Sequence, residues 1–270
     1  MATPFVTTTR DGGVATVRLN RPDKLNALTL DMLDGLVDAA RELSQDRSLR
    51  AVILAGEGDS FCAGLDFGFV LKDPAGIAKA FAVRPWRGTN TFQEACWAYR
   101  RLPVPVVAAV HGNCLGGGVQ IALGADFRIT APDARWSVLE GRWGLIPDMS
   151  GIQSLSEHVG MDVAKRLTMT GQMLDGEEAV RIGLATEAAV DPHERAQAFV
   201  DELLLRSPDA LAAAKRLFNG TWHRGPRWTF ARERIEQLSL LAAANTKRAQ
   251  KAAFAKTAAE YAERGRRLIP

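Results

Sequence analysis

Several features are scarce or missing in this sequence of 270 residues, and each absence excludes a class of protein. The chain has only three cysteines, Cys62, Cys96 and Cys114, with no CxxC pair among them. We therefore expect neither a disulfide framework nor a metal site of the zinc type, and a reducing compartment such as the cytoplasm fits best. No stretch approaches about 18 uninterrupted apolar residues, so we expect no transmembrane helix. The first residues lack a basic segment followed by an apolar run, so we expect no signal peptide.

Charge of one sign is not in large excess either. The formal net charge is +3, too small for the whole chain to be a nucleic-acid-binding surface. Hydrophobic residues make up 47% of the chain and charged residues 24%, which is typical of a globular protein with a sizeable core.

Apolar runs that alternate with helical patterns predict an α/β fold with a mainly parallel sheet. Strands are expected within residues 14–22, where the alternation ends in a loop at Pro22, and at 51–58, 104–112 and 127–131. Helices are expected at 30–44, after a Thr29 cap, and at 117–123. Residues 67–100 have uneven periodicity and predict a mobile or helical cover. Beyond about Glu194 the pattern is helical only.

Two loops rich in small residues follow predicted strands. "NCLGGGVQ", residues 113–120, places three glycines before a predicted helix start, where unpaired N–H groups suit an anion or an oxyanion. The alternative is that these glycines allow tight packing of the helix on the sheet. "FCAGLDF", residues 61–67, ends another strand, so the two turns could aim two N–H groups at one oxygen. Cys62 is expected to be a packing residue, and Asp66 either a ligand contact or a loop-stabilising acceptor.

Two carboxylates lie in "WSVLEGRWGLIPDMSG", residues 136–151. Glu140 has apolar neighbours, which favours a raised pKa suited to general acid/base catalysis. Asp148 follows a Gly and a Pro that bend the chain. It could face the same cavity as Glu140, or it could cap the helix expected to start at Met149 or Ser150. Glu94 is expected on a solvated helix face.

These motifs, together with "RPDKLNAL" at residues 21–28, occur in an order and spacing that resemble the enoyl-CoA hydratase/isomerase (crotonase) superfamily. The resemblance covers about residues 5–190 well. It implies a spiral of ββα units (residues 1–195, the acyl-CoA-binding core) and a C-terminal helical domain (residues 196–270) that helps to build trimers. It also implies an acyl-CoA thioester as substrate. No further cofactor is implied, because coenzyme A is part of that substrate.

The resemblance also assigns roles to residues. The backbone N–H groups of Leu65 and Gly117 correspond to the two donors that stabilise the enolate of the thioester. Substrate or CoA contacts correspond to six positions: Lys24, Leu25, Ala27, Ala63, Asp66 and Gly116. Hydratases of this family use two glutamates, one at the Glu140 position and one where this chain has Gln120.

Gln120 decides the expected reaction. An amide can hydrogen-bond a water but cannot exchange protons with it near neutral pH. Dienoyl-CoA isomerases resemble this chain in having carboxylates at the positions of Glu140 and Asp148. We therefore expect a double-bond shift in an unsaturated fatty acyl-CoA, with Glu140 as base and Asp148 as second acid. The alternative is hydration of a 2-enoyl-CoA with a water held by Gln120.

Two readings from other classes remain open at this stage. One is a catalytically silent acyl-CoA-binding protein. The other is RNA binding through the basic residues of the tail: Lys247, Arg248, Lys251, Lys256, Arg264, Arg266 and Arg267. The small net charge favours a solvated helix face over RNA binding, so nucleic acid is not an expected partner. A homotrimer or hexamer is expected, without a metal and without a membrane.

Overall fold

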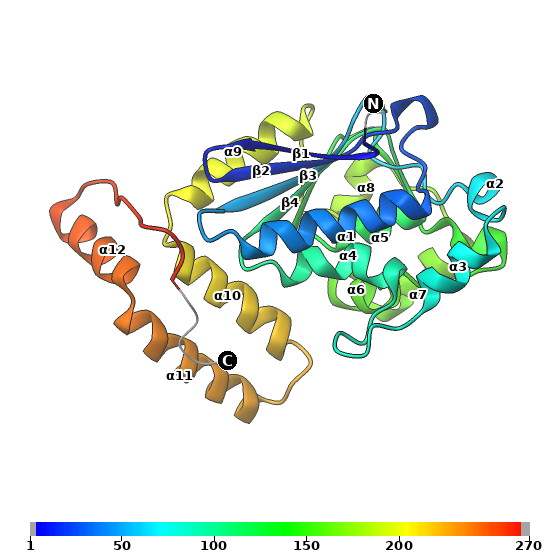
Figure 1. The fold of residues 1–270 in the computed structure, drawn as a ribbon. Helices are drawn as coiled ribbons and strands as arrows, with labels where there is room; N and C mark the ends of the chain where they lie inside the picture. The colour runs from blue at the N-terminus through cyan, green and yellow to red at the C-terminus, as the bar shows by residue number, and fades with distance from the viewer. Residues whose placement is uncertain (1–3, 266–270) are drawn as a thin grey trace.

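A computed structural model describes residues 4–265 and contains a central six-stranded sheet with helices on both faces (Figure 1). The strands lie in the order β1-β2-β3-β4-β6-β8. Their bounds are Val6–Asp11, Val14–Leu19, Ala51–Gly56, Val106–Val110, Phe127–Thr130 and Glu187–Ala188. β1 is antiparallel to β2 and every other pair is parallel. The expectation of an α/β fold with a mainly parallel sheet is therefore confirmed.

A second, two-stranded parallel sheet carries the glycine-rich segment. It pairs β5 (Asn113–Leu115) with β7 (Arg135–Ser137). β5 runs directly into α5 (Gly117–Leu123), as the sequence predicts, and β7 precedes the 3₁₀ helix η2 (Leu139–Trp143). This small sheet therefore brings the glycine motif beside the segment that carries Glu140.

Alternate residues of the strands pack into two cores. One face, with Val52 and Leu54, packs under α1 (Leu30–Gln45) and α4 (Thr91–Arg101). The other face packs against Ala196 and Val200 of α9 (Pro192–Leu204). β3 is buried along its whole length, which is why its sequence is a continuous apolar run. Thr29 caps α1 by accepting a hydrogen bond from Met32 N, as predicted.

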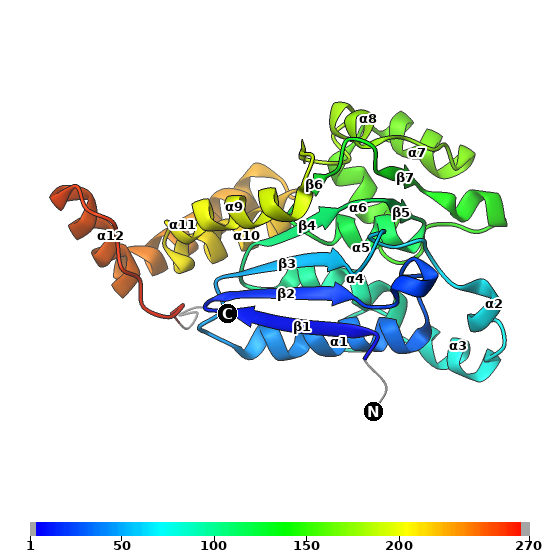
Figure 2. The same ribbon diagram turned by 90° about the horizontal axis from the view of Figure 1, so that it is seen from above.

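The remaining helices cover the ends of the sheet. Residues 67–89 form α2 (Phe67–Val70), α3 (Pro74–Phe81) and a turn, at the carboxyl ends of β2–β4 (Figure 2). The expectation of a helical cover is confirmed for these short helices, but not for residues 91–100, which belong to α4 and pack into the core. After η2 the chain continues through α6 (Gly151–His158), α7 (Met161–Thr170) and α8 (Gly176–Arg181).

The last three described helices are α10 (Pro208–Thr221), α11 (Pro226–Ala242) and α12 (Ala244–Ala255), and they extend beyond the opposite end of the sheet (Figures 1 and 2). The boundary expected between residues 195 and 196 falls inside α9, whose next turn packs on the sheet. The division into two domains stays a prediction.

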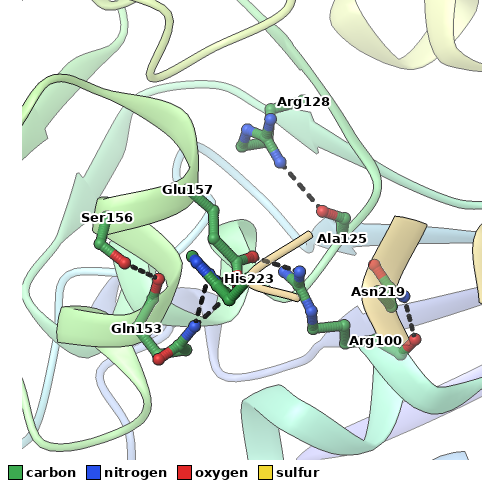
Figure 3. Close-up of polar contacts among 8 residues, drawn as sticks. All are labelled: Arg100, Ala125, Arg128, Gln153, Ser156, Glu157, Asn219 and His223. Atoms are coloured by element: carbon green, nitrogen blue, oxygen red, sulfur yellow. Dashed lines mark hydrogen bonds and ion pairs between the residues drawn. The ribbon is translucent and has the colours of Figure 1, made fainter. Parts of the chain in front are cut away.

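Polar contacts fix α10 to the core. Lys215 Nζ donates to Tyr99 O at 3.1 Å and to Val104 O at 2.9 Å, and it pairs with Asp126 at 2.7 Å. Nearby, Figure 3 shows Glu157 of α6 between Arg100 of α4 and His223, which follows α10. The partners Val104 and Asp126 lie just before β4 and β6, so the Lys215 contacts lie at the end of the sheet where the parallel strands begin.

Two expectations about charged residues are corrected. Glu94 is 3% exposed rather than solvated, because it pairs with Arg87 and Arg101 and accepts a hydrogen bond from Thr89. Arg264, part of the basic tail, is buried and donates to Leu49 O and Asp46 O. Arg266 and Arg267 lie outside the described residues. Within residues 4–265, no helix is long and apolar enough to cross a membrane.

Candidate active site

The two small-residue turns meet, as the sequence predicts. Cys62 N donates to Asn113 O at 2.7 Å, and Leu115 N donates to Cys62 O at 2.9 Å. Leu65, three residues after Cys62, and Gly117 at the first position of α5 therefore line the same cavity. Within the described part of the chain, neither the Leu65 N–H nor the Gly117 N–H donates to a protein acceptor. Two unpaired donors at one cavity can hold an oxyanion.

The three glycines have different roles. Gly116 has φ +52° and ψ −117°, a conformation that favours glycine, and it turns the chain from β5 into α5. A Cβ on Gly118 would lie 2.6 Å from Cys62 O, so this position must be bare for α5 to pack on the turn. The packing role and the exposed N–H role are thus divided among neighbours, and the two expectations for this motif are compatible.

Gln120 is 2% exposed and connects three segments of the site. Its Nε2 donates to Glu140 Oε1 at 2.6 Å. Its Oε1 accepts hydrogen bonds from Met149 N at 2.8 Å and Gly151 N at 3.0 Å. The amide therefore ties α5 to η2 and to the start of α6.

Glu140 is partly buried at the start of η2, and burial raises the pKa of its carboxyl above the ordinary value. The hydrogen bond from Gln120 acts against this shift, and the nearby Asp148 carboxylate adds to it. Oε2 of Glu140 is buried and has no hydrogen-bond partner among the described residues. A carboxylate in this setting is suited to proton transfer near neutral pH.

Asp148 does not cap the following helix. α6 begins at Gly151, and its N-cap residue is Ser150, which has φ +71° and makes no side-chain cap hydrogen bond. Asp148 instead lines the cavity with Glu140, and burial raises the pKa of its carboxyl as well. Of the two alternatives for Asp148, the structure favours the cavity position.

The cavity has a volume of about 350 Å³, within the usual range for small-molecule sites. Apolar side chains form most of its wall, and they come from the cover and from the segment around η2. They are Leu65, Phe67, Val70, Leu71, Ile77, Phe81, Phe92, Leu139, Trp143, Leu145, Ile146 and Met149. The site therefore combines one polar end, with two free N–H groups and two carboxylates, and an apolar remainder.

Sequence reasoning missed the wall contributed by the cover. The periodicity of residues 67–92 is broken because α2 and α3 are short. Two aromatic pairs hold this segment in place: Phe67 contacts Trp143 and Phe81 contacts Phe92, each with ring centroids 4.9 Å apart. The cluster of aromatic residues was the one available signal.

Five of the six expected CoA contacts lie on the 21–28 loop and the 62–66 turn, and the sixth, Gly116, lies between β5 and α5. Lys24 and Leu25 are exposed, and Leu25 O accepts from Ala63 N at 2.9 Å. Ala27 O accepts from Arg21 Nη1 at 3.0 Å, and Gly116 lines the cavity next to Gly117.

Asp66 has protein partners for both carboxylate oxygens. It accepts from Phe69 N, capping α2, and pairs with Arg21 at 2.8 Å. The loop-stabilising role is therefore observed, and the pairing with Arg21 lowers the pKa of this carboxyl.

Asn26 is a structural residue that sequence reasoning missed. It is fully buried at φ +56° and donates to the carbonyls of Glu57 and Ser60, at 2.9 and 2.7 Å. Its side chain thus joins the 21–28 loop to the loop that precedes Cys62. An Asn within the predicted loop "KLNAL" was the available signal for a residue with positive φ, because Asn adopts this conformation more readily than most residues.

Among the described residues, no three His, Cys, Asp or Glu side chains form a group that could hold a metal ion.

Known proteins are similar to this chain in both sequence and fold. A sequence model of the enoyl-CoA hydratase/isomerase family matches residues 9–267. A short-chain-enoyl-CoA hydratase of Clostridium acetobutylicum is 36% identical over 214 residues, 78% of this chain and 79% of that protein. The bovine mitochondrial enoyl-CoA hydratase domain-containing protein 2 is 34% identical over 75% of this chain and 69% of its own length. The crystal structure of an enoyl-CoA hydratase from Mycobacterium smegmatis superimposes with a TM-score of 0.85 at 28% identity, covering 96% of this chain and 99% of that one.

Proposed function

The chain belongs to the enoyl-CoA hydratase/isomerase family and is an enzyme of that family. From this premise we propose that it shifts a double bond in an unsaturated acyl-CoA. The observation that carries the proposal is the set of groups at the polar end of the cavity. Two free N–H groups lie near Glu140, and the residue that touches Glu140 is an amide rather than a second acid.

In the proposed reaction, the thioester oxygen accepts hydrogen bonds from Leu65 N–H and Gly117 N–H. Glu140 removes a proton from C2 of a 3-enoyl ester, and the electron pair moves onto the thioester oxygen as a dienolate. A proton then returns at C4, which leaves the double bond at C2. Asp148, whose pKa is raised by burial, is the proposed donor of that second proton.

Three substrates test the proposal: a 2-enoyl-CoA, a 3-enoyl-CoA and a 3,5-dienoyl-CoA. We expect conjugation absorbance to appear with the 3-enoyl ester or to shift with the dienoyl ester, and hydration of the 2-enoyl ester to be slow. Glu140→Gln should lower turnover by about 10²–10⁴-fold while CoA-ester binding is kept. Glu177→Gln, on the exposed surface of α8, is the matched control and should leave turnover unchanged. Fast hydration of the 2-enoyl ester would overturn the proposal.

Hydration is the second candidate, because the relatives named above are called enoyl-CoA hydratases. In hydration, Glu140 would be the acid/base group, and its partner at position 120 would be the Gln120 amide. Asp148→Asn separates the two candidates further. This change should impair a double-bond shift that needs a second acid more than it impairs hydration by Glu140.

We also propose that copies of the chain assemble through α10–α12 as a trimer or hexamer. Large apolar side chains are exposed there, including Trp228, Leu238, Leu241 and Phe254. Apolar surface of this extent supports a protein–protein interface. The three buried, unpaired cysteines support a reducing compartment, and we propose the cytoplasm.

A further inference from the structure

We propose that Gln120 is a positioning residue, which holds Glu140 by one carboxylate oxygen and fixes the backbone beside Asp148, so that the other oxygen of Glu140 is free to act as the base. The inference rests on the proposed function in taking Glu140 as the base. It goes beyond that function by assigning the placement of this base to the amide at position 120.

The hydrogen bonds of the Gln120 side chain carry the first step. A side-chain amide oxygen has two acceptor sites, and Met149 N and Gly151 N occupy both of them. One of the two N–H donors is used by Glu140 Oε1. The oxygen therefore has no remaining capacity to accept a hydrogen bond from a catalytic water, and its role is internal to the protein.

The second step concerns Glu140. With Oε1 held at 2.6 Å by the amide, Oε2 is the carboxylate oxygen that has no protein partner among the described residues. The amide is neutral and donates, so it favours the ionised form of Glu140 that can accept a proton. A carboxylate at position 120 would place two acidic oxygens at this short distance. Two like charges this close raise the pKa of one of the two carboxyl groups.

The third step concerns the backbone that the amide holds. Met149 and Gly151 flank Ser150, which has a positive φ of +71° and therefore a strained conformation for a residue with a side chain. A Cβ on Gly151 would lie 2.5 Å from Gln120 Oε1, so a close approach is required at this point. The amide thus fixes the segment that follows Asp148 while it orients Glu140.

The experiment compares Gln120→Glu and Gln120→Met with the unmodified protein. The readout is the pH profile of kcat/KM with whichever of the three CoA esters is turned over. Gln120→Glu keeps the shape and the acceptor for Met149 N and Gly151 N. We expect the acidic limb of its profile to move up by about one pH unit or more, because a second carboxylate raises the pKa of the base.

Gln120→Met keeps the length of the side chain but removes every polar contact. We expect kcat to fall by about 10²-fold with a small change in KM, because the base is displaced while the cavity remains. The matched control is Gln197→Glu. Gln197 is an exposed residue of α9 that donates to the Asp201 carboxylate at 2.9 Å, and this change should leave the profile unchanged.

An acidic limb that stays in place in folded Gln120→Glu overturns the inference. If Gln120→Met fails to fold, Gln120→Glu still decides, because it retains both backbone hydrogen bonds. The protein could hydrate the 2-enoyl ester and turn over neither the 3-enoyl nor the dienoyl ester, which would reject the proposed double-bond shift. An acidic limb of the hydration profile that moves up in Gln120→Glu would then still support the role of Gln120. Exchange of the α-hydrogen of a saturated acyl-CoA in D2O gives a readout of Glu140 that needs no net reaction.

Discussion

Gly118 illustrates how a missing side chain positions the site. The Cβ that Gly118→Ala would add lies 2.6 Å from the backbone oxygen of Cys62, which cannot move without shifting the turn that leads to Leu65. We expect a loss of about 1–3 kcal/mol in the free energy of unfolding, as for other overpacked positions. Turnover should fall as well, because the Leu65 N–H moves relative to Gly117. Urea denaturation and kcat measure the two effects.

The control for this change is Gly220→Ala in α10, where an added Cβ meets nothing within 4 Å. Alanine in a helix is favoured over glycine by about 0.5–1 kcal/mol, so this variant should be as stable as the parent or more stable. Equal stability losses in the two variants would contradict the role given to Gly118.

For single residues, the sequence predicted chemical roles better than contacts in the folded chain. Glu140 was predicted to be a base from its apolar neighbours, and burial does raise its pKa. The contacts of Gln120 could not be predicted, because Met149 and Gly151 are 29 and 31 residues away and meet it only in the folded chain. Glu94 was misjudged for the same reason: the turn that brings Arg87 to it leaves no periodic signal.

At the scale of elements, the strands of the sheet were the most predictable part of the molecule. β3 and β4 are buried along their whole length and are continuous apolar runs, so the local sequence pattern predicts both strands. The cover at residues 67–89 is different. α2 has four residues and α3 has eight, too few turns for a periodic pattern to be distinguished from a loop.

The cover nevertheless forms much of the apolar wall, so it should control which acyl groups fit. Phe81, at the end of α3, lines the cavity and contacts Phe92 of α4 with ring centroids 4.9 Å apart. Phe81→Ala should enlarge the apolar end and raise the ratio of kcat/KM for longer over shorter acyl-CoA esters by about 10-fold. Competition between two esters of different length measures this ratio directly.

Phe5→Ala is the control for the loss of a ring. Phe5 is 40% exposed and Phe81 is 49% exposed, but Phe5 does not line the cavity. The ratio of kcat/KM for longer over shorter esters should stay at the parental value in Phe5→Ala. A Phe81→Ala enzyme with the parental ratio would show that the cover does not limit the length of the acyl group.

At the scale of the whole molecule, buried polar groups join the site-bearing core to the C-terminal helices. Lys215 is buried with Asp126 and two backbone carbonyls as its partners, and burial lowers the pKa of its ammonium group. The sequence predicted helices in this region but not how they dock, because a lysine on a helix is ordinarily solvated. The docking of α10 depends on residues that are distant in sequence, Tyr99, Val104 and Asp126.

His158, at the end of α6, gives the molecule a predictable sensitivity to acid. Burial lowers the pKa of this imidazole to about 3, and the nearby Arg128 and Arg100 act in the same direction. In the unfolded chain the group titrates at its ordinary value of 6.5. Between these two values the unfolded chain binds a proton that the folded chain does not, so stability falls as the pH falls. The contribution is present above pH 6.5 and is lost progressively toward pH 3.

Replacing His158 by Phe tests this source of acid sensitivity. Nε2 of His158 has no hydrogen-bond partner within residues 4–265, so the Phe ring gives up only the hydrogen bond between the imidazole and the Leu123 backbone. We expect His158→Phe to be less stable than the parent at pH 7 by about 1 kcal/mol, because that hydrogen bond is lost. Between pH 6 and pH 4 its stability should fall less steeply, by up to about 1.4 kcal/mol per pH unit. Urea denaturation midpoints of the two proteins, measured between pH 6 and pH 4, test this expectation. Parallel pH dependences would show that His158 is not buried in its neutral form.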